Sequence, residues 1–221
     1  PSPIRKFSDS EYTAKGIELQ EDLSDCEVLM GVKEVPLEML IPNKTYFFFS
    51  HTFKLQPYNA TLLREILAKK IKLVDYEVLK DENNNRLIGF GRYAGIVGCY
   101  NAFRTLGIKS KSYDLKAAHD CDNRVEMESY LHKVKLPSNF KCVLTGLGKV
   151  GNGAREIIKL LPIKEVSKSD FLNNTFNEPV FTHLDMDDYN KRITDGGFSK
   201  KDFYNQPELY KSIFPDYAAQ A

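Results

Sequence analysis

Three short apolar runs in the N-terminal part of the chain each end at a residue that can move or hold a proton. "CEVLMGVK" ends at Lys33, "YFFFSH" ends at His51, and "IKLVDYE" ends at Glu77. Histidine titrates near neutral pH, and a lysine that is partly desolvated beside other cations can accept a proton. These residue types therefore suit general acid–base chemistry.

The elements that would position these residues are alternating strands and helices. Apolar runs and periodicity predict strands over 26–32, 44–51, 71–77 and 86–91, and helices over 59–70 and 92–107. Asn59 is the expected N-cap of the first helix, and small residues such as Gly95 would let the second lie close to a neighbouring backbone.

Alternating strands and helices predict a parallel α/β sheet. The carboxyl ends of its strands share the edge at which open α/β sheets bind ligands. Lys33, His51 and Glu77 are therefore expected to converge on one cleft. Each of the three, taken alone, also fits a solvated residue at a strand end.

A glycine-rich turn follows another apolar strand, over 140–144. Gly146, Gly148 and Gly151 form the G-x-G-x-x-G pattern between a strand and an amphipathic helix, which is the setting of a dinucleotide-binding turn. The first glycine permits the tight turn, the second lets a pyrophosphate approach, and the third allows close helix packing. We expect this turn, with Lys149 and Val150 inside it, to bind the cofactor at the helix N-terminus.

The choice between NAD and NADP depends on the residue that meets the adenosine ribose at the end of the next strand. The candidates there are Ser167, Lys168 and Asp170. An acid would favour NAD, whereas Ser167 and Lys168 could hold a 2′-phosphate, so both cofactors remain open. Only 70 residues follow Gly151, fewer than a complete Rossmann domain needs, so we expect the chain to be part of a longer enzyme.

Composition excludes several function classes. Lysine plus arginine (31) nearly balances aspartate plus glutamate (30), so no basic field indicates nucleic acid or a membrane surface, and no apolar run is long enough to span a bilayer. The four dispersed cysteines indicate reduced thiols in the cytoplasm. The stretch from His119 to Asp122 lacks a second ligand group at a metal spacing, and His183 is expected in a surface loop, so no metal site is predicted.

Five segments together resemble the lysine–2-oxoglutarate reductase, or lysine-forming saccharopine dehydrogenase, family. They are "GVKEVP", "LIPNKTYFFFSHTFKLQ", "LVDYEVL", "NRLIGFGRYAGIVG" and "VLTGLGKVGNGA". That family is related to alanine dehydrogenase and to the transhydrogenase N-terminal domains. The resemblance implies two Rossmann-like domains with parallel sheets and a cleft between them. These would be an alanine-dehydrogenase-like substrate domain (1–135) and a partial NAD(P)-binding domain (136–221).

The resemblance also implies a reaction and its residues. An NAD(P)-dependent oxidoreductase would reversibly join L-lysine to 2-oxoglutarate and reduce the imine to saccharopine. Lys33 and His51 would be catalytic, and the substrate-binding residues would be Lys54, Glu77, Arg86 and, from its charge, Arg92. The alternatives are an alanine-dehydrogenase-like enzyme and a non-catalytic nucleotide-binding protein. Small molecules are the expected partners, and a homo-oligomer is left open.

Overall fold

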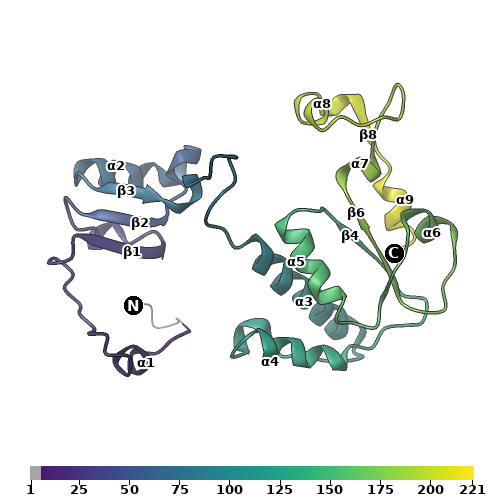
Figure 1. The fold of residues 1–221 in the computed structure, drawn as a ribbon, viewed down its shortest axis with the longest axis horizontal. Coiled ribbons are helices and arrows are strands. Elements are labelled where there is room, and N and C mark those ends of the chain that lie inside the picture. Colours follow the sequence, from purple (N-terminus) through teal and green to yellow (C-terminus); the bar gives the residue numbers. More distant parts are fainter. Residues whose placement is uncertain (1–5) are drawn as a thin grey trace. The chain divides into compact units, whose positions relative to one another are not determined.

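The computed structural model describes residues 6–221, and its contacts divide the chain after Gly89 into two compact units (Figure 1). Each unit contains a sheet of parallel strands, so the predicted α/β class is confirmed. The contacts group residues 90–135 with the second unit, whereas the sequence predicted a boundary after residue 135. The assignment of residues 1–135 to one substrate-binding domain stays a prediction, as does the cleft between the domains.

The first unit is built on three parallel strands in the order β1-β2-β3. They span Val28–Lys33 (β1), Thr45–Phe49 (β2) and Lys72–Asp75 (β3). The short helix α1 (Asp9–Thr13) precedes them, and α2 (Ala60–Ala68) connects β2 to β3. All three strands therefore end at the same edge of the sheet.

One face of this sheet packs against α2. Leu62 and Ile66 lie one helical turn apart and are buried against Tyr46 and Phe48, which alternate along β2. Burying a side chain of this size contributes about 1.5–3 kcal/mol, so these contacts fix α2 on the sheet. Leu67, the residue after Ile66, is 69% exposed and takes no part in this contact.

The second unit has its own parallel sheet, in the order β4-β6-β5. Its strands are β4 (Lys141–Thr145), β5 (Lys164–Glu165) and β6 (Val180–Leu184), and β7 (Asn190–Arg192) forms an antiparallel pair with β8 (Tyr210–Ser212). The helices are α3 (Gly91–Ser110), α4 (Arg124–Ser129), α5 (Lys149–Ile158), α6 (Lys168–Asn173), α7 (Met186–Tyr189), α8 (Lys200–Asn205) and α9 (Phe214–Ala218).

Glycines let α3 and α5 cross with their backbones in contact. A Cβ atom on Gly95 would lie 1.9 Å from the carbonyl oxygen of Val150, and one on Gly153 would lie 2.1 Å from that of Arg92. Both distances are far below any real contact, so only glycine fits at either position. The close approach predicted for the small residues of α3 is confirmed at Gly95.

Three sequence-based assignments differ from the structure. Residues 86–91 form no strand: the Asp81 carboxylate accepts hydrogen bonds from the backbone N–H groups of a tight turn, and a single antiparallel bridge joins Lys80 to Arg86. α3 continues past Gly107 to Ser110. His183 lies within β6 and is partly buried, rather than in a surface loop.

Within residues 6–221, no helix is both long enough and apolar enough to cross a membrane. The same part of the chain contains no group of three His, Cys, Asp or Glu side chains placed to hold a metal ion.

Candidate active site

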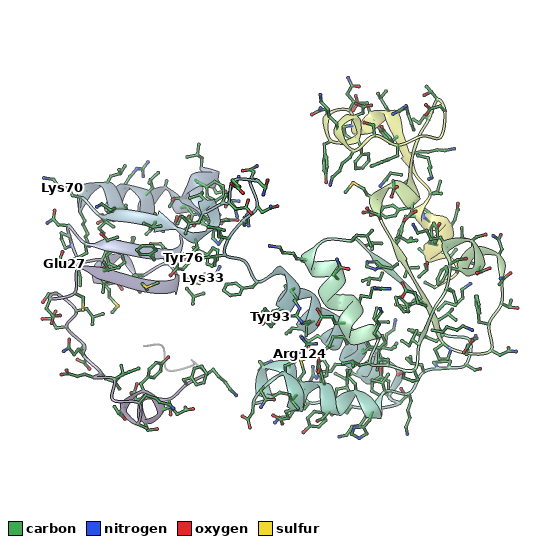
Figure 2. All side chains as sticks on the ribbon, in the orientation of Figure 1. Glu27, Lys33, Lys70, Tyr76, Tyr93 and Arg124 are labelled. Atoms are coloured by element: carbon green, nitrogen blue, oxygen red, sulfur yellow. The ribbon has the colours of Figure 1, made fainter. Side chains whose placement is uncertain are left out.

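The three strand ends of the first sheet bring Lys33, His51 and Glu77 together. Lys33 is the last residue of β1, and His51 and Glu77 follow β2 and β3 by two residues each. Figure 2 shows Lys33 and Tyr76 at one end of the unit, and Glu27 and Lys70 at the other. The convergence predicted at the carboxyl edge is therefore present.

The Glu77 carboxylate is the centre of this group. Its side chain is only 6% exposed. One oxygen, Oε2, lies 2.7 Å from His51 Nδ1, and the other, Oε1, lies 3.1 Å from Lys54 Nζ. Arg86 Nη2 is 2.8 Å from the same Oε1. One buried acid thus contacts three basic side chains, two from the turn after β2 and one from residue 86.

The contacts of His51 assign its two ring nitrogens to different tasks. Because Nδ1 faces the Glu77 carboxylate, which can only accept, Nδ1–H is the donor. In the neutral ring Nε2 then carries the lone pair, and this atom lies 3.3 Å from Lys33 Nζ. A proton can therefore be exchanged between the lysine and the imidazole while Glu77 holds the ring in place.

The backbone at His51 is held in the left-handed region. His51 has φ 57° and Leu55 has φ 52°, and a short 3-10 turn over Thr52–Lys54 lies between them. Such a conformation costs about 1–3 kcal/mol for a residue other than glycine and is found where surrounding contacts hold it. The turn brings Lys54 back to the carboxylate that His51 binds, which explains the H-x-x-K spacing.

Opposing effects act on the pKa of Glu77. Burial is the largest single effect and by itself raises the pKa of the carboxyl. The hydrogen bonds from His51 and Lys54, together with the charge of Arg86, outweigh it. The net pKa of Glu77 is lowered from its ordinary value of 4.5, so the group is an anion at neutral pH.

Glu77→Gln should destabilise the fold most at neutral pH. A lowered folded-state pKa gives stability that is fully present above the ordinary pKa of 4.5 and is lost as the pH falls through the folded-state value. Hydrogen bonds to a charged group contribute about 1.5–3 kcal/mol each, so the free energy of unfolding should fall by about that amount. Urea unfolding at several pH values measures this, with the exposed Glu82→Gln as control. A difference between Glu77→Gln and the parent that does not shrink in acid would contradict the expectation.

Arg92, predicted to bind substrate, makes its contacts within the second unit. Its Nε and Nη2 atoms bind the two carboxylate oxygens of Glu156 at 2.7 and 2.8 Å, and Arg124 binds the same carboxylate at 3.0 Å. The hydrogen bonds from Arg92 and then from Arg124 outweigh the opposing effect of burial and lower the pKa of Glu156 to about 2. The guanidinium of Arg92 thus ties α3 to α5, and its role in binding substrate stays a prediction.

The glycine-rich turn is tightly packed at Gly151 and open at Gly148. Gly146 has φ +90°, and a Cβ on Gly151 would lie 1.8 Å from the carbonyl oxygen of Gly146. At Gly148, the N-cap of α5, a Cβ would meet no atom within 4 Å. The first turn of α5, at Lys149 and Val150, presents backbone N–H groups that have no partner within the helix. The donors and the open space fit a dinucleotide pyrophosphate.

His183, within β6, contacts this turn, and the sequence analysis did not predict that contact. Its Nε2 atom donates a hydrogen bond to the carbonyl oxygen of Gly146 at 2.7 Å, and Gly146 N–H donates to the carbonyl of Leu184 at 2.7 Å. The apolar run "VFTHL" around His183 is the signal that could have placed it in a strand.

The predicted ribose-binding residues lie at the start of α6, after β5. The Ser167 hydroxyl caps α6 by accepting from the N–H of Asp170, and Lys168 Nζ lies 2.6 Å from Asp188 Oδ1. In the sheet, β6 lies between β5 and the glycine strand β4, so β5 and β4 are not paired with each other. The role of Ser167, Lys168 and Asp170 at the ribose stays a prediction.

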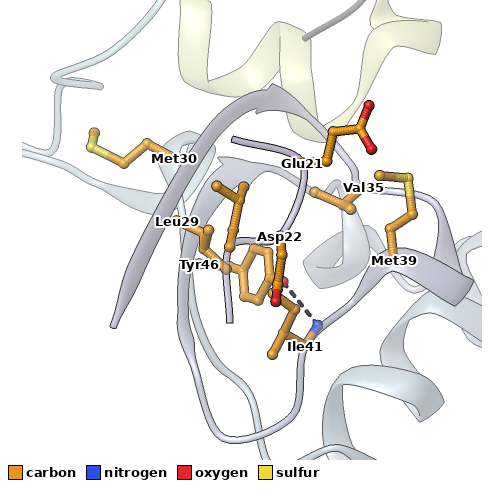
Figure 3. A pocket seen from close by; sticks show the side chains of 9 residues that line it. Glu21, Asp22, Leu29, Met30, Val35, Met39, Ile41 and Tyr46 are labelled. Atoms are coloured by element: carbon orange, nitrogen blue, oxygen red, sulfur yellow. Dashed lines mark hydrogen bonds between the residues drawn. The ribbon is translucent and has the colours of Figure 1, made fainter. Parts of the chain in front are cut away.

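A separate pocket of about 370 Å³ opens beside β1 (Figure 3). Its lining is mostly apolar, from Leu29, Met30, Val35, Met39, Ile41, Tyr46 and Leu23, with the acids Glu21 and Asp22. The Tyr46 hydroxyl accepts from the N–H of Ile41 at 2.9 Å. The charged residues that line this pocket are both acids, so the pocket does not suit a substrate with several carboxylates.

The chain is similar in sequence to one family model and to several known proteins. Residues 3–97 match the family model described as alanine dehydrogenase/PNT, N-terminal domain. Over 97% of its length the chain is 33% identical to the mitochondrial alpha-aminoadipic semialdehyde synthase of Rattus norvegicus, of which it covers 25%. Over 74% of its length it is 25% identical to the NAD(+), L-lysine-forming saccharopine dehydrogenase of Yarrowia lipolytica, of which it covers 48%.

These proteins are homologues of this chain. The resemblance to the saccharopine dehydrogenase family inferred from the five segments is therefore confirmed. The chain spans about a quarter of the length of the rat relative and about half that of the fungal one. Among solved structures, an L-alanine dehydrogenase aligns with a TM-score of 0.49 at 13% identity, over 80% of this chain and 48% of that one.

Proposed function

We propose that the whole protein is an NAD(P)-dependent oxidoreductase of lysine metabolism. It reversibly joins the ε-amine of L-lysine to the carbonyl carbon of 2-oxoglutarate, with loss of water, and reduces the resulting imine to saccharopine. The observation that carries the proposal is the contact of Lys33 with His51, whose ring is held by the buried Glu77. The fungal relative, which is named as an NAD(+), L-lysine-forming saccharopine dehydrogenase, supports the same reaction class.

Lys33 and His51 perform the proton transfers in this proposal. Forming the imine requires the attacking nitrogen to lose protons and the carbonyl oxygen to gain them before it leaves as water. His51 exchanges a proton at Nε2, the ring nitrogen that faces Lys33, while Glu77 keeps Nδ1–H in place. Glu77, which is buried, stays an anion and a positioning group throughout.

Cationic side chains beside this pair would hold the substrate carboxylates. The side chains of Lys54 and Arg86 are 37% and 52% exposed, and each contacts Glu77 through one nitrogen. A guanidinium can bind a carboxylate through two parallel hydrogen bonds, which suits the carboxylates of 2-oxoglutarate.

The glycine-rich turn would bind the cofactor through the backbone of Gly146 to Gly151. Bound there, the nicotinamide supplies the hydride for reduction of the imine. His183 fixes the turn by its hydrogen bond to Gly146, and α5 offers the phosphates its N-terminus.

The test of this function is a substrate comparison with the full-length protein. Oxidation of NADH or NADPH, followed by absorbance, should require L-lysine together with 2-oxoglutarate and should yield saccharopine by mass spectrometry. The match to the alanine dehydrogenase family model favours one second candidate, an enzyme acting on a smaller oxo acid. Turnover with ammonia plus pyruvate, and none with lysine plus 2-oxoglutarate, would replace the proposal by that candidate. Binding of the nucleotide without either turnover would indicate a non-catalytic protein.

Lys168→Asp should shift any preference for NADP toward NAD, because it replaces a cation that could pair with the 2′-phosphate by an acid that could bind the ribose. In the structure Asp188 already neutralises Lys168, so Asp188→Asn should free the ammonium and shift the preference the other way. The ratio of kcat/KM for the two cofactors measures both effects. An unchanged ratio in both variants would place Lys168 outside the ribose pocket.

The compartment and the oligomeric state also belong to the proposal. The sequence predicted a cytoplasmic protein, whereas the rat relative is named as mitochondrial. Cell fractionation with an antibody to the full-length protein decides between the two. The homo-oligomer left open by the sequence is tested by size-exclusion chromatography with light scattering.

A further inference from the structure

A buried polar cluster, Ser50, Thr52 and Asp75, lies at the ends of β2 and β3. The three residues are 0%, 7% and 6% exposed, and none of them belongs to the group that would meet substrate. A polar side chain taken out of water is costly unless its hydrogen bonds are made, and a carboxylate is the most costly of these. The hydrogen bonds of these three side chains must therefore be satisfied within the protein.

Both oxygens of the Asp75 carboxylate are used, and each leads to a residue of the candidate site. Oδ1 accepts from the backbone N–H of Glu77 at 2.8 Å. Oδ2 accepts from the hydroxyl of Ser50 at 2.6 Å and from its backbone N–H at 3.3 Å. One carboxylate therefore connects the residue before His51 to the backbone of Glu77.

The hydrogen bonds of Ser50 continue past His51 in a defined direction. Because the Ser50 hydroxyl donates its proton to Asp75, its oxygen must accept from Thr52. It does so twice, from the Thr52 hydroxyl at 2.8 Å and from the Thr52 N–H at 3.1 Å. His51 is thus held from both sides, at the position where its backbone has a φ of 57°.

We propose that Asp75 is a positioning residue that orients His51 and Glu77 so that their side chains contact each other. Through Ser50 and Thr52 it holds the left-handed backbone of His51, and through the Glu77 N–H it fixes the carboxylate that receives the His51 ring. Asp75 itself meets neither substrate nor cofactor. The proposal rests on the proposed function and adds a residue to which neither the sequence analysis nor the comparisons assigned a role.

Asp75→Asn in the full-length enzyme tests this. The amide has the same shape and can still accept from the Glu77 N–H, but its NH₂ group would face the two donors of Ser50. A displacement of about 1 Å at a catalytic group can cost about 10²-fold, so kcat should fall by that order while the KM for NAD(P)H stays unchanged. The exposed Glu82→Gln is the control and should match the parent. An Asp75→Asn enzyme with parental kcat, even with a lower melting temperature, would overturn the proposal.

If Asp75→Asn does not fold, a second pair of variants tests whether these hydrogen bonds position His51. Thr52→Val keeps the size of the side chain but removes the hydroxyl that donates to Ser50, whereas Thr52→Ser keeps it. Thr52→Val should lower kcat, and Thr52→Ser should restore it. A Thr52→Val enzyme with parental kcat would overturn the proposal.

The side-chain nitrogen-15 signals of His51 separate this proposal from the proposed function. They report the hydrogen bonds of the imidazole without turnover, and they are assigned with His51→Gln. A parent enzyme inactive with lysine plus 2-oxoglutarate would refute the proposed reaction, yet Asp75→Asn should still move the His51 signals and Glu82→Gln should not. Unmoved signals in a folded Asp75→Asn protein would overturn the positioning role.

Discussion

His51→Gln and Lys33→Met should each lower the turnover of the full-length enzyme by about 10²–10⁴-fold, the range that a general acid–base group contributes. Glutamine can still accept or donate a hydrogen bond at the position of the ring but cannot exchange a proton near neutral pH. Methionine keeps the length of Lys33 without its amine. The KM for NAD(P)H should barely change, because neither residue lies in the glycine-rich turn.

Two matched controls belong to this experiment. Lys72→Met removes an exposed lysine at the opposite, amino end of the same sheet. His119→Gln removes a histidine whose side chain is 84% exposed. Both should leave kcat at the parental value in steady-state assays with lysine and 2-oxoglutarate. If His51→Gln and Lys33→Met behave like these controls, they are ordinary solvated residues at strand ends.

Gly148→Val and Gly151→Val should have different effects on stability, although both should abolish binding of NAD(P)H. At Gly148 the new Cβ meets no atom within 4 Å, so the fold should keep its melting temperature while the side chain occupies the space that the pyrophosphate needs. Binding of NAD(P)H, followed by the fluorescence of the nicotinamide, should be lost.

At Gly151 the new Cβ would lie 1.8 Å from the carbonyl oxygen of Gly146, so the turn itself must move. Overpacking of this kind costs about 1–3 kcal/mol or more, and a lower melting temperature should accompany the loss of binding. A Gly148→Val protein that binds the cofactor as well as the parent would show that this turn is not the site. Equal melting temperatures for Gly151→Val and the parent would contradict the packing argument.

The position of Glu77 in the site could be predicted from the sequence, whereas the role of Asp75 could not. Glu77, His51 and Lys33 could be predicted to converge because parallel strands end at one edge, and apolar runs mark where strands end. Asp75 and Ser50 could not be predicted, because a polar residue near the end of a strand looks the same in the sequence whether it is solvated or buried. Only the pairing of β2 with β3 shows that their side chains meet.

Tertiary contacts determine features that the sequence analysis did not predict. Arg92 was assigned from its charge, and only the crossing of α3 over α5 shows that Glu156 takes its guanidinium. The position of β6 between β4 and β5 is likewise set by tertiary contacts, to which local sequence patterns do not respond. His183 was misplaced because a histidine within a short apolar run was weighed as a polar residue rather than as part of a strand.

The central claim, that Lys33 and His51 form one proton-transfer unit, is tested most directly by the double variant Lys33→Met/His51→Gln. Groups that act as a unit lose most of their joint contribution when either one is removed. The turnover of the double variant should therefore be close to that of the less active of the two single variants. A loss equal to the product of the two single losses would show that the residues act independently, and near-parental turnover would contradict the assignment of this site.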